Sequence, residues 1–206
     1  SIPTYDLTLK LSKNEHRYYH SSIDFQRRDI LNLFPSEKKI IINKSSQQIY
    51  LEAKKILNKC WPQISELYDE IIYGFHPIEI GRTEESYSSP SAFGIIFFRM
   101  DSSDPLKWAE IMVHELSHHL LFILTSINGF LPDTDWSKMV FSRIRNEMRP
   151  LIGLYHGVIA QLFMLNLAYR VKEKAPSENY KRIIETFKNR FQEDKQSISF
   201  YFETLL

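Results

Sequence analysis

Apolar side chains recur at helical spacing in three long segments of this chain, and these segments predict its main elements. In the first segment, Ser45 and Ser46 offer an N-cap before apolar residues that recur every three or four positions between residues 49 and 57. Pro62 is expected to end or kink this helix, because proline lacks the N–H that the next helical turn needs.

The second segment begins with Asp104 and Pro105, an N-cap residue followed by a proline at the first helical position. Its periodic apolar residues continue to about Ser126, where Asn128 and Gly129 stop the pattern. This segment therefore predicts a long helix.

The third segment predicts a second long helix, from about residue 150 to residue 174. Residues 151–169 are apolar enough to resemble a membrane span, but His156, Gln161 and Asn166 interrupt them. A buried core helix is the better interpretation of this composition.

Short apolar runs between these helices predict strands. Four such runs are found, at residues 40–42, 71–73, 78–80 and 94–100. Residues 81–90 are polar and predict a loop, a short helix is expected over residues 24–33, and the chain from residue 178 onward predicts one or two C-terminal helices.

These elements predict one domain over residues 1–206, of the α+β class and mainly helical. The expected core resembles that of zinc peptidases (zincin-like). In such a core, a small sheet precedes the helix that begins at Pro105, and that helix packs against the second long helix.

The composition of the chain limits which classes of molecule it is expected to bind. The 26 basic residues nearly balance the 25 acidic ones, so the net charge of +1 gives no overall field to attract nucleic acid or an anionic membrane. A single cysteine, Cys60, excludes an intramolecular disulfide and fits a reducing cytoplasm, and the first residues lack the features of a signal peptide.

The chemistry is expected in the middle of the second segment, where the sequence reads His114-Glu115-Leu116-Ser117-His118. Residues four apart on a helix differ by about 40° around its axis, so both imidazoles project from one face and suit the capture of a metal ion. The surrounding residues are apolar, so these polar groups need partners, which argues against a chance pair of surface histidines. His119, about 140° from His114, is expected to make a polar contact on the other side of the helix.

A catalytic metal site needs a third protein ligand and an open position. Position 124 is leucine, so a third histidine six residues after His118 is absent, and Glu147 and His156 are the candidates. We favour His156, because Gly153 and Ala160 share its helical face and small residues permit close approach of a neighbouring helix. A core histidine with ordinary hydrogen bonds is the alternative.

Three arginines, Arg143, Arg145 and Arg149, precede the second long helix. Solvated surface charge is the usual explanation for such a run. Arginine also binds carboxylates through two parallel hydrogen bonds, so a carboxylate site close to His156 is the alternative.

Three stretches together resemble one family: residues 113–119 (VHELSHH), residues 141–145 (FSRIR) and residues 149–157 (RPLIGLYHG). The chain looks like the α-ketoglutarate-dependent HExxH-type peptide β-hydroxylases, which act on ribosomally made peptides. The loop of Ser88, Ser89 and Pro90 and the strand at Gly94 are also similar, so the resemblance covers about residues 88–164.

The resemblance implies Fe(II) held by His114, His118 and His156, with 2-oxoglutarate and dioxygen at the open positions. Arg149 or Arg145 would bind the distal carboxylate of 2-oxoglutarate, and the substrate would be a precursor peptide hydroxylated on the β-carbon of a side chain. This chemistry needs no general base, so Glu115 would position other groups.

Two alternatives remain at this point. One is a zinc metallopeptidase in which Glu115 is the general base, Glu147 is the third ligand and the strand at residues 94–100 aligns the peptide. The other is a catalytically inert peptide-binding module with a structural metal, for which three histidines without a fourth protein ligand would be unusual.

Overall fold

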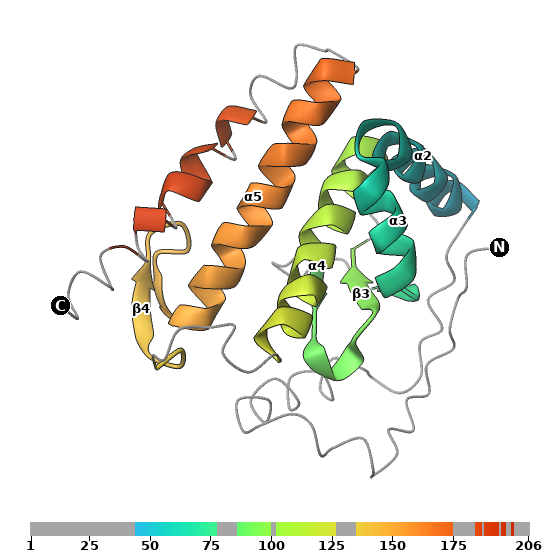
Figure 1. Cartoon of the computed structure of the whole chain (residues 1–206). Coiled ribbons are helices and arrows are strands. Elements are labelled where there is room, and N and C mark those ends of the chain that lie inside the picture. Colours follow the sequence, from blue (N-terminus) through green and yellow to red (C-terminus); the bar gives the residue numbers. More distant parts are fainter. Residues whose placement is uncertain are drawn as a thin grey trace, which may run out of the picture.

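The computed structural model describes residues 44–77, 86–99, 102–126 and 135–174, together with parts of 184–199 that are helical. The elements expected at residues 24–33, 40–42 and 78–80 lie outside the described residues. Within the described residues the chain is mainly helical with two small sheets, which confirms the predicted α+β class (Figure 1).

Helices α2 (Lys44–Cys60) and α3 (Pro62–Ile71) form the first part of the core. Only Trp61 separates them, and Pro62 begins α3, where a residue without an N–H leaves no helical hydrogen bond unmade. The strand predicted at residues 71–73 is wrong, because the strand begins only at Gly74 and Ile72 and Tyr73 connect it to α3. Ile71 is the last residue of α3, and it faces the core with Ile64 and Tyr68 at helical spacing.

The first sheet contains β1 (Gly74–Pro77), β2 (Ser86–Ser88) and β3 (Ile95–Phe98), with β3 in the centre. Strand β1 is parallel to β3, whereas β2 is antiparallel to it. The 3-10 helix η2 (Pro90–Ala92) connects β2 to β3. All four residues of β3 are buried, which confirms the strand predicted there. The loop predicted over residues 81–90 is wrong at β2.

Gly94 lets β3 begin close to the end of α3. Its φ of 83° lies in the left-handed region, and a Cβ atom there would meet the Tyr73 ring and lie 2.9 Å from the Ile71 carbonyl oxygen. The Gly94 carbonyl accepts a hydrogen bond from the Tyr73 N–H at 2.8 Å. Only glycine suits this conformation and this space.

Helix α4 (Pro105–Thr125) is the central helix of the fold and carries the histidine motif. The Asp104 carboxylate accepts a hydrogen bond from the Leu106 N–H at 2.9 Å, so the predicted N-cap is confirmed. The helix packs against α2, α3, β2 and α5, and this explains why it is buried on most sides.

A hairpin of β4 (Met139–Ser142) and β5 (Glu147–Pro150) leads into α5 (Leu151–Lys174). Asn146 in the hairpin turn has a φ of 54°, a conformation that asparagine tolerates better than most residues. The N–H groups of Leu151 and Ile152 donate to carbonyls at the base of the hairpin, those of Lys138 (2.9 Å) and Trp136 (3.0 Å). The hairpin therefore satisfies the first amides of α5 and fixes where this helix begins.

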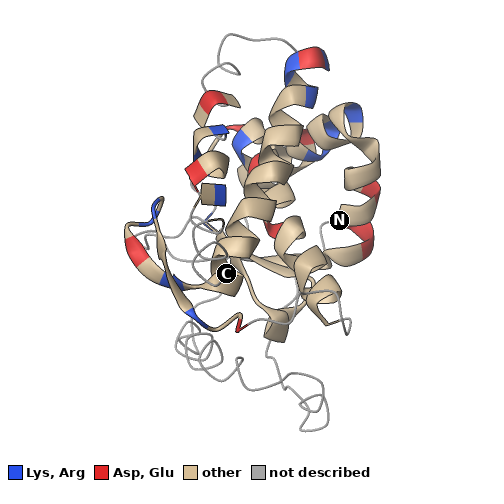
Figure 2. Cartoon of the chain, turned by 60° about the vertical axis from the view of Figure 1, so that its left-hand side comes forward, with Lys and Arg blue, Asp and Glu red and all other residues tan. Residues whose placement is uncertain are grey.

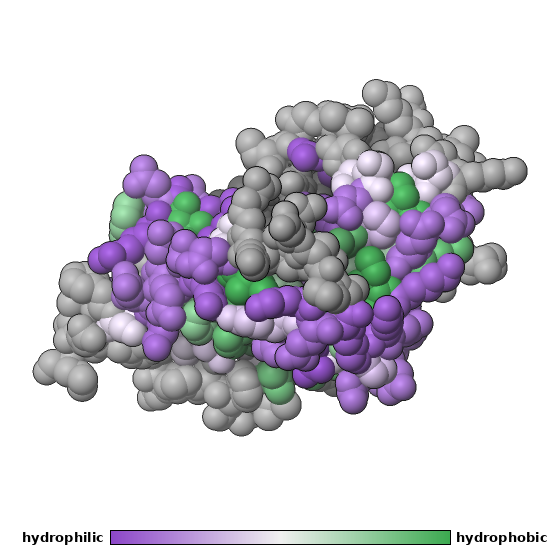
Figure 3. All heavy atoms as spheres, turned by 90° about the horizontal axis from the view of Figure 1, so that it is seen from above, coloured by the Kyte–Doolittle hydropathy of each residue, from purple (hydrophilic) through white to green (hydrophobic). Residues whose placement is uncertain are grey.

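Helix α5 lies beside α4 and runs antiparallel to it (Figure 1). Its length and composition alone would let it cross a membrane, but it also supplies Leu167 and Val171 to the main core. Lys172 and Lys174 lie near its end, and the described part of the face seen from above is mainly hydrophilic with small apolar areas (Figure 3). The predicted packing of the motif helix against the second long helix is confirmed.

Candidate functional site

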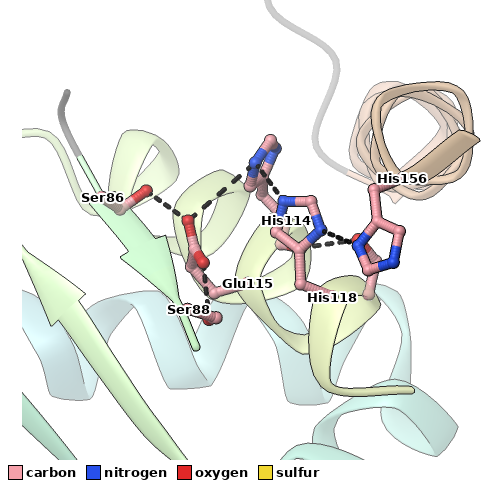
Figure 4. Close-up of polar contacts among 7 residues, drawn as sticks. Ser86, Ser88, His114, Glu115, His118 and His156 are labelled. Carbon is pink, nitrogen blue, oxygen red and sulfur yellow. Dashed lines mark hydrogen bonds and ion pairs between the residues drawn. The ribbon is translucent and has the colours of Figure 1, made fainter. Parts of the chain in front are cut away.

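The structure brings together the three histidines that the sequence singled out. The Nε2 atoms of His114 and His118 are 3.0 Å apart, and the Nδ1 atoms of His118 and His156 are 3.2 Å apart (Figure 4). His118 thus lies between the other two, with α4 supplying two of the rings and α5 the third.

These distances suit pairs of metal ligands. Two nitrogens bonded to one metal at about 2.1 Å lie ~3.0 Å apart at a right angle and ~3.4 Å apart at a tetrahedral angle. His118, however, faces His114 and His156 with opposite nitrogens of its ring. No group of three His, Cys, Asp or Glu side chains in the described part of the chain is arranged to hold a metal ion. A metal shared by all three histidines therefore requires the ring of His118 or His156 to turn.

The donor set itself fits a transition metal. Burial lowers the pKa of His118 well below 6.5, and the neighbouring histidines and the charge of Arg149 lower it further. Burial also lowers the pKa of His156 to about 4. A neutral imidazole keeps the lone pair that binds metal, and imidazole suits iron, zinc and copper.

Glu115 is fully buried beside these histidines and is held by two serines of β2. The Ser86 hydroxyl donates to Oε1 and the Ser88 hydroxyl to Oε2, each at 2.6 Å (Figure 4). Oε1 lies 3.9 Å from His114 Nε2. Burial raises the pKa of Glu115 to about 7, although the two serine hydrogen bonds act in the opposite direction.

Sequence reasoning missed the role of both serines, because they fall in a stretch that was predicted to be a polar loop. The signal that could have found them is their spacing. Residues two apart in a strand point to the same face, so both hydroxyls reach one carboxylate from β2.

His119 lies on the other side of α4, as predicted. Its Nδ1 accepts a hydrogen bond from the Gly94 N–H at 3.3 Å, and its ring meets Phe93 and Phe122 edge-on. Burial lowers the pKa of His119 to about 4. His119 therefore links α4 to the start of β3 and takes no part in the group of three histidines.

The three arginines and Glu147 lie at different places on the hairpin and make different contacts. Arg149 is paired with the buried Val140 across the hairpin, so it shares the inner face, and its charge acts on His118. Arg143 donates to the Gln196 side chain at 3.2 Å, and Arg145 is exposed in the turn. Glu147 is paired with the buried Ser142 and so lies on the same face as Arg149. The Glu147 side chain is 57% exposed and that of Arg149 40%, and 3.5 Å separates Glu147 Oε1 from Arg149 Nε, so the contact of Glu147 is with Arg149.

The reason given for the position of His156 needs correction. A Cβ atom at Gly153 would meet nothing within 4 Å, so this glycine does not mark a close approach of two helices. Instead, Leu151 and Leu154 pack against Val140 of the hairpin, and this packing fixes the turn of α5 that carries His156.

A comparison with models of protein families and with curated proteins finds no match to this chain.

Proposed function

We propose that this chain is an Fe(II)- and 2-oxoglutarate-dependent oxygenase that hydroxylates the β-carbon of a side chain in a ribosomally made peptide. The meeting of His114, His118 and His156 at the contact of α4 with α5 carries this proposal. Three imidazoles that leave other positions open suit a transition metal, iron among them.

In this proposal the three histidines hold the iron, and the core is zincin-like, with a small sheet beside the helix that carries two ligands. When bound, the iron lets dioxygen convert 2-oxoglutarate into succinate and CO₂ and insert the second oxygen atom into a C–H bond of the peptide. The protein supplies the ligands, the site for the keto acid and the position of the peptide.

Arg149 is the residue that we assign to the distal carboxylate of 2-oxoglutarate. It lies on the inner face of the hairpin and its charge acts on His118, whereas Arg145 is exposed in the turn. A guanidinium binds a carboxylate through two parallel hydrogen bonds, so Arg149 would exchange Glu147 for the cosubstrate. Arg145 is the second choice.

Glu115 acts as a positioning residue. Because each of its oxygens accepts a hydrogen bond from a serine of β2, the carboxyl group ties this strand to α4 beside His114. The proposed reaction requires no general base, so a buried carboxyl held on both oxygens is compatible with it.

The second candidate is a zinc metallopeptidase, and one observation favours it. Glu115 lies 3.9 Å from His114 and its pKa is raised to about 7, which suits a general base at neutral pH. Two of its expected parts change, however. Glu147 is exposed, so His156 would be the third ligand, and β3 is the central strand, so a peptide would have to align on one of the edge strands β1 and β2.

Binding of the cosubstrate tests the proposal directly. Anaerobic addition of Fe(II) and 2-oxoglutarate is expected to produce a visible charge-transfer band, and His156→Ala is expected to abolish it. Arg149→Gln is expected to weaken binding of 2-oxoglutarate by at least about tenfold, as loss of a bidentate ion pair does. Arg145→Gln, at the second choice for this carboxylate, is expected to leave binding unchanged, and a loss of binding there instead would assign the role to Arg145.

The reaction product separates the two candidates. A peptide incubated with the iron-loaded protein, 2-oxoglutarate and air is expected to gain one oxygen atom, as measured by mass spectrometry. Absence of the band together with zinc-dependent cleavage of the peptide would overturn the oxygenase and favour the metallopeptidase.

A further inference from the structure

One face of the β4–β5 hairpin presents an apolar surface, which we call the hairpin outer face and define as Met139, Phe141 and Met148. These side chains are 50%, 49% and 54% exposed. Phe141 lies directly opposite Met148, and opposite residues of an antiparallel pair share a face, so the three side chains form one surface. Val140 and Ser142 alternate with them along β4 and are buried.

The clustering sets this surface apart from the rest of the described surface. Eight large apolar side chains are exposed among the described residues, and three of them lie on this short hairpin. Isolated exposed apolar residues are ordinary, whereas a cluster on one element marks a place where another molecule binds.

The hairpin is also basic at its turn, which carries Arg143 and Arg145. Arg149 lies on the inner face beside Glu147, and the charge of Lys138 acts on Asp135. In Figure 2 the ribbon of the hairpin carries basic positions together with acidic ones. Since the whole chain is almost neutral, the positive charge of the turn is local, and it complements an acidic partner.

The hairpin is joined to the histidine site. Its inner face packs through Val140 onto Leu154, two residues before His156 on α5. Arg149, on the inner face, follows Met148, on the outer face. A chain bound along the outer face would therefore lie beside the element that positions the proposed third ligand.

We infer that the hairpin outer face docks an extended segment of the peptide substrate that combines apolar and acidic residues. The identity of this partner as the substrate rests on the proposed function. In an extended chain alternate side chains point to opposite sides, so apolar residues can contact Phe141 and Met148 while acidic ones reach the arginines of the turn.

Fluorescence anisotropy tests this inference without metal or cosubstrate. The probe is a fluorescein-labelled peptide in which valine and glutamate alternate, and its counterpart carries lysine in place of glutamate. The glutamate peptide is expected to bind at least about tenfold more tightly than the lysine peptide, and added salt is expected to weaken it.

Variants locate the binding surface. The double change Phe141→Ser and Met148→Ser is expected to weaken binding of the glutamate peptide by about tenfold or more, as loss of interface anchors does. Arg145→Glu is expected to weaken the glutamate peptide and strengthen the lysine peptide. Leu51→Ser, at a residue of α2 that is 48% exposed, is the matched control and is expected to change neither.

Equal binding of both peptides, or binding that the hairpin variants do not alter, would overturn the inference. Two other results would overturn the inference: a dimer in analytical ultracentrifugation that the hairpin variants abolish, or binding to vesicles of anionic lipid that these variants abolish. In either case the surface would have another occupant. The charge-transfer band is read separately in the double variant Phe141→Ser and Met148→Ser, which leaves both candidate arginines in place, so failure of the docking surface is distinguishable from failure of the oxygenase.

Discussion

At the scale of single residues, Glu115 shows how a few hydrogen bonds fix a buried acid. Its two oxygens accept from Ser86 and Ser88, and these bonds span 29 and 27 residues of sequence. They hold the carboxyl group beside His114 and tie an edge strand to the central helix.

Removal of these hydroxyls tests that role. Ser86→Ala and Ser88→Ala are each expected to lower the free energy of unfolding by about 1–3 kcal/mol, because each leaves a buried carboxyl oxygen without its donor. Urea denaturation followed by circular dichroism measures the loss. The exposed Ser103→Ala is the control, and an equally small change in all three variants would contradict the role.

His119 predicts a dependence of stability on pH. Its folded-state pKa of about 4 lies below the usual 6.5, so the unfolded chain binds the proton more tightly and stability falls as pH falls through this interval. From about pH 7 to about pH 5, His119 alone is expected to cost about 2 kcal/mol.

The variant His119→Asn isolates this contribution, because an amide oxygen can still accept from the Gly94 N–H. In chelator-treated protein, its free energy of unfolding is expected to vary less with pH than that of the wild type, by about 2 kcal/mol over the same interval. Parallel profiles for the two proteins would show that His119 does not titrate in this way.

At the scale of the elements, two glycines are expected to respond in opposite directions to the same change. Gly94→Ala is expected to lower the free energy of unfolding by about 2–4 kcal/mol, because of its left-handed φ and the Ile71 carbonyl oxygen 2.9 Å from the added methyl group. Gly153→Ala is expected to raise it by about 0.5–1 kcal/mol, because the added methyl group meets nothing in α5. Urea denaturation measures both, and a loss of stability in Gly153→Ala would restore the close helix approach that the structure argues against.

Elements with local signals could be predicted from the sequence, and those that depend on distant partners could not. The cap of α4 at Asp104 and the buried run of β3 depend on neighbouring residues, so both were predicted correctly. Ile71 was assigned to a strand because β-branched residues favour strands, but the helical spacing of the α3 core residues decides its structure. Strand β2 is polar and is held by Glu115, far along the chain, so nothing local distinguished it from a loop.

The candidate site follows the same division. His114 and His118 could be paired from helical geometry alone. His156 lies beside His118, but the reason given for its approach is one that Gly153 does not support, and its role as third ligand stays a prediction. Which of Arg149 and Arg145 lies on the inner face of the hairpin depends on the register of β4 and β5, and the sequence did not predict this hairpin.

At the scale of the whole molecule, a metal at the histidines would join the two longest helices. An ion that binds only the folded state adds about 4 kcal/mol at a free concentration about 1,000 times its Kd. Thermal unfolding is therefore expected to shift upward with added Fe(II) under anaerobic conditions. His156→Ala is expected to reduce this shift, and His119→Asn is expected to retain it. An unchanged shift in His156→Ala would remove α5 from the site.

The central position of His118 also constrains where hydrogen atoms reside. A neutral imidazole carries one N–H and one lone pair, so a 3.0 Å contact between two Nε2 atoms needs a hydrogen on one of them. A cation bound by both Nε2 atoms needs both lone pairs, so that hydrogen would move to an Nδ1 atom, and in His118 this atom faces His156. The tautomer of His118 thus affects its contacts with both α4 and α5. Uptake of a metal would move a hydrogen within the histidine group even without a change in net charge.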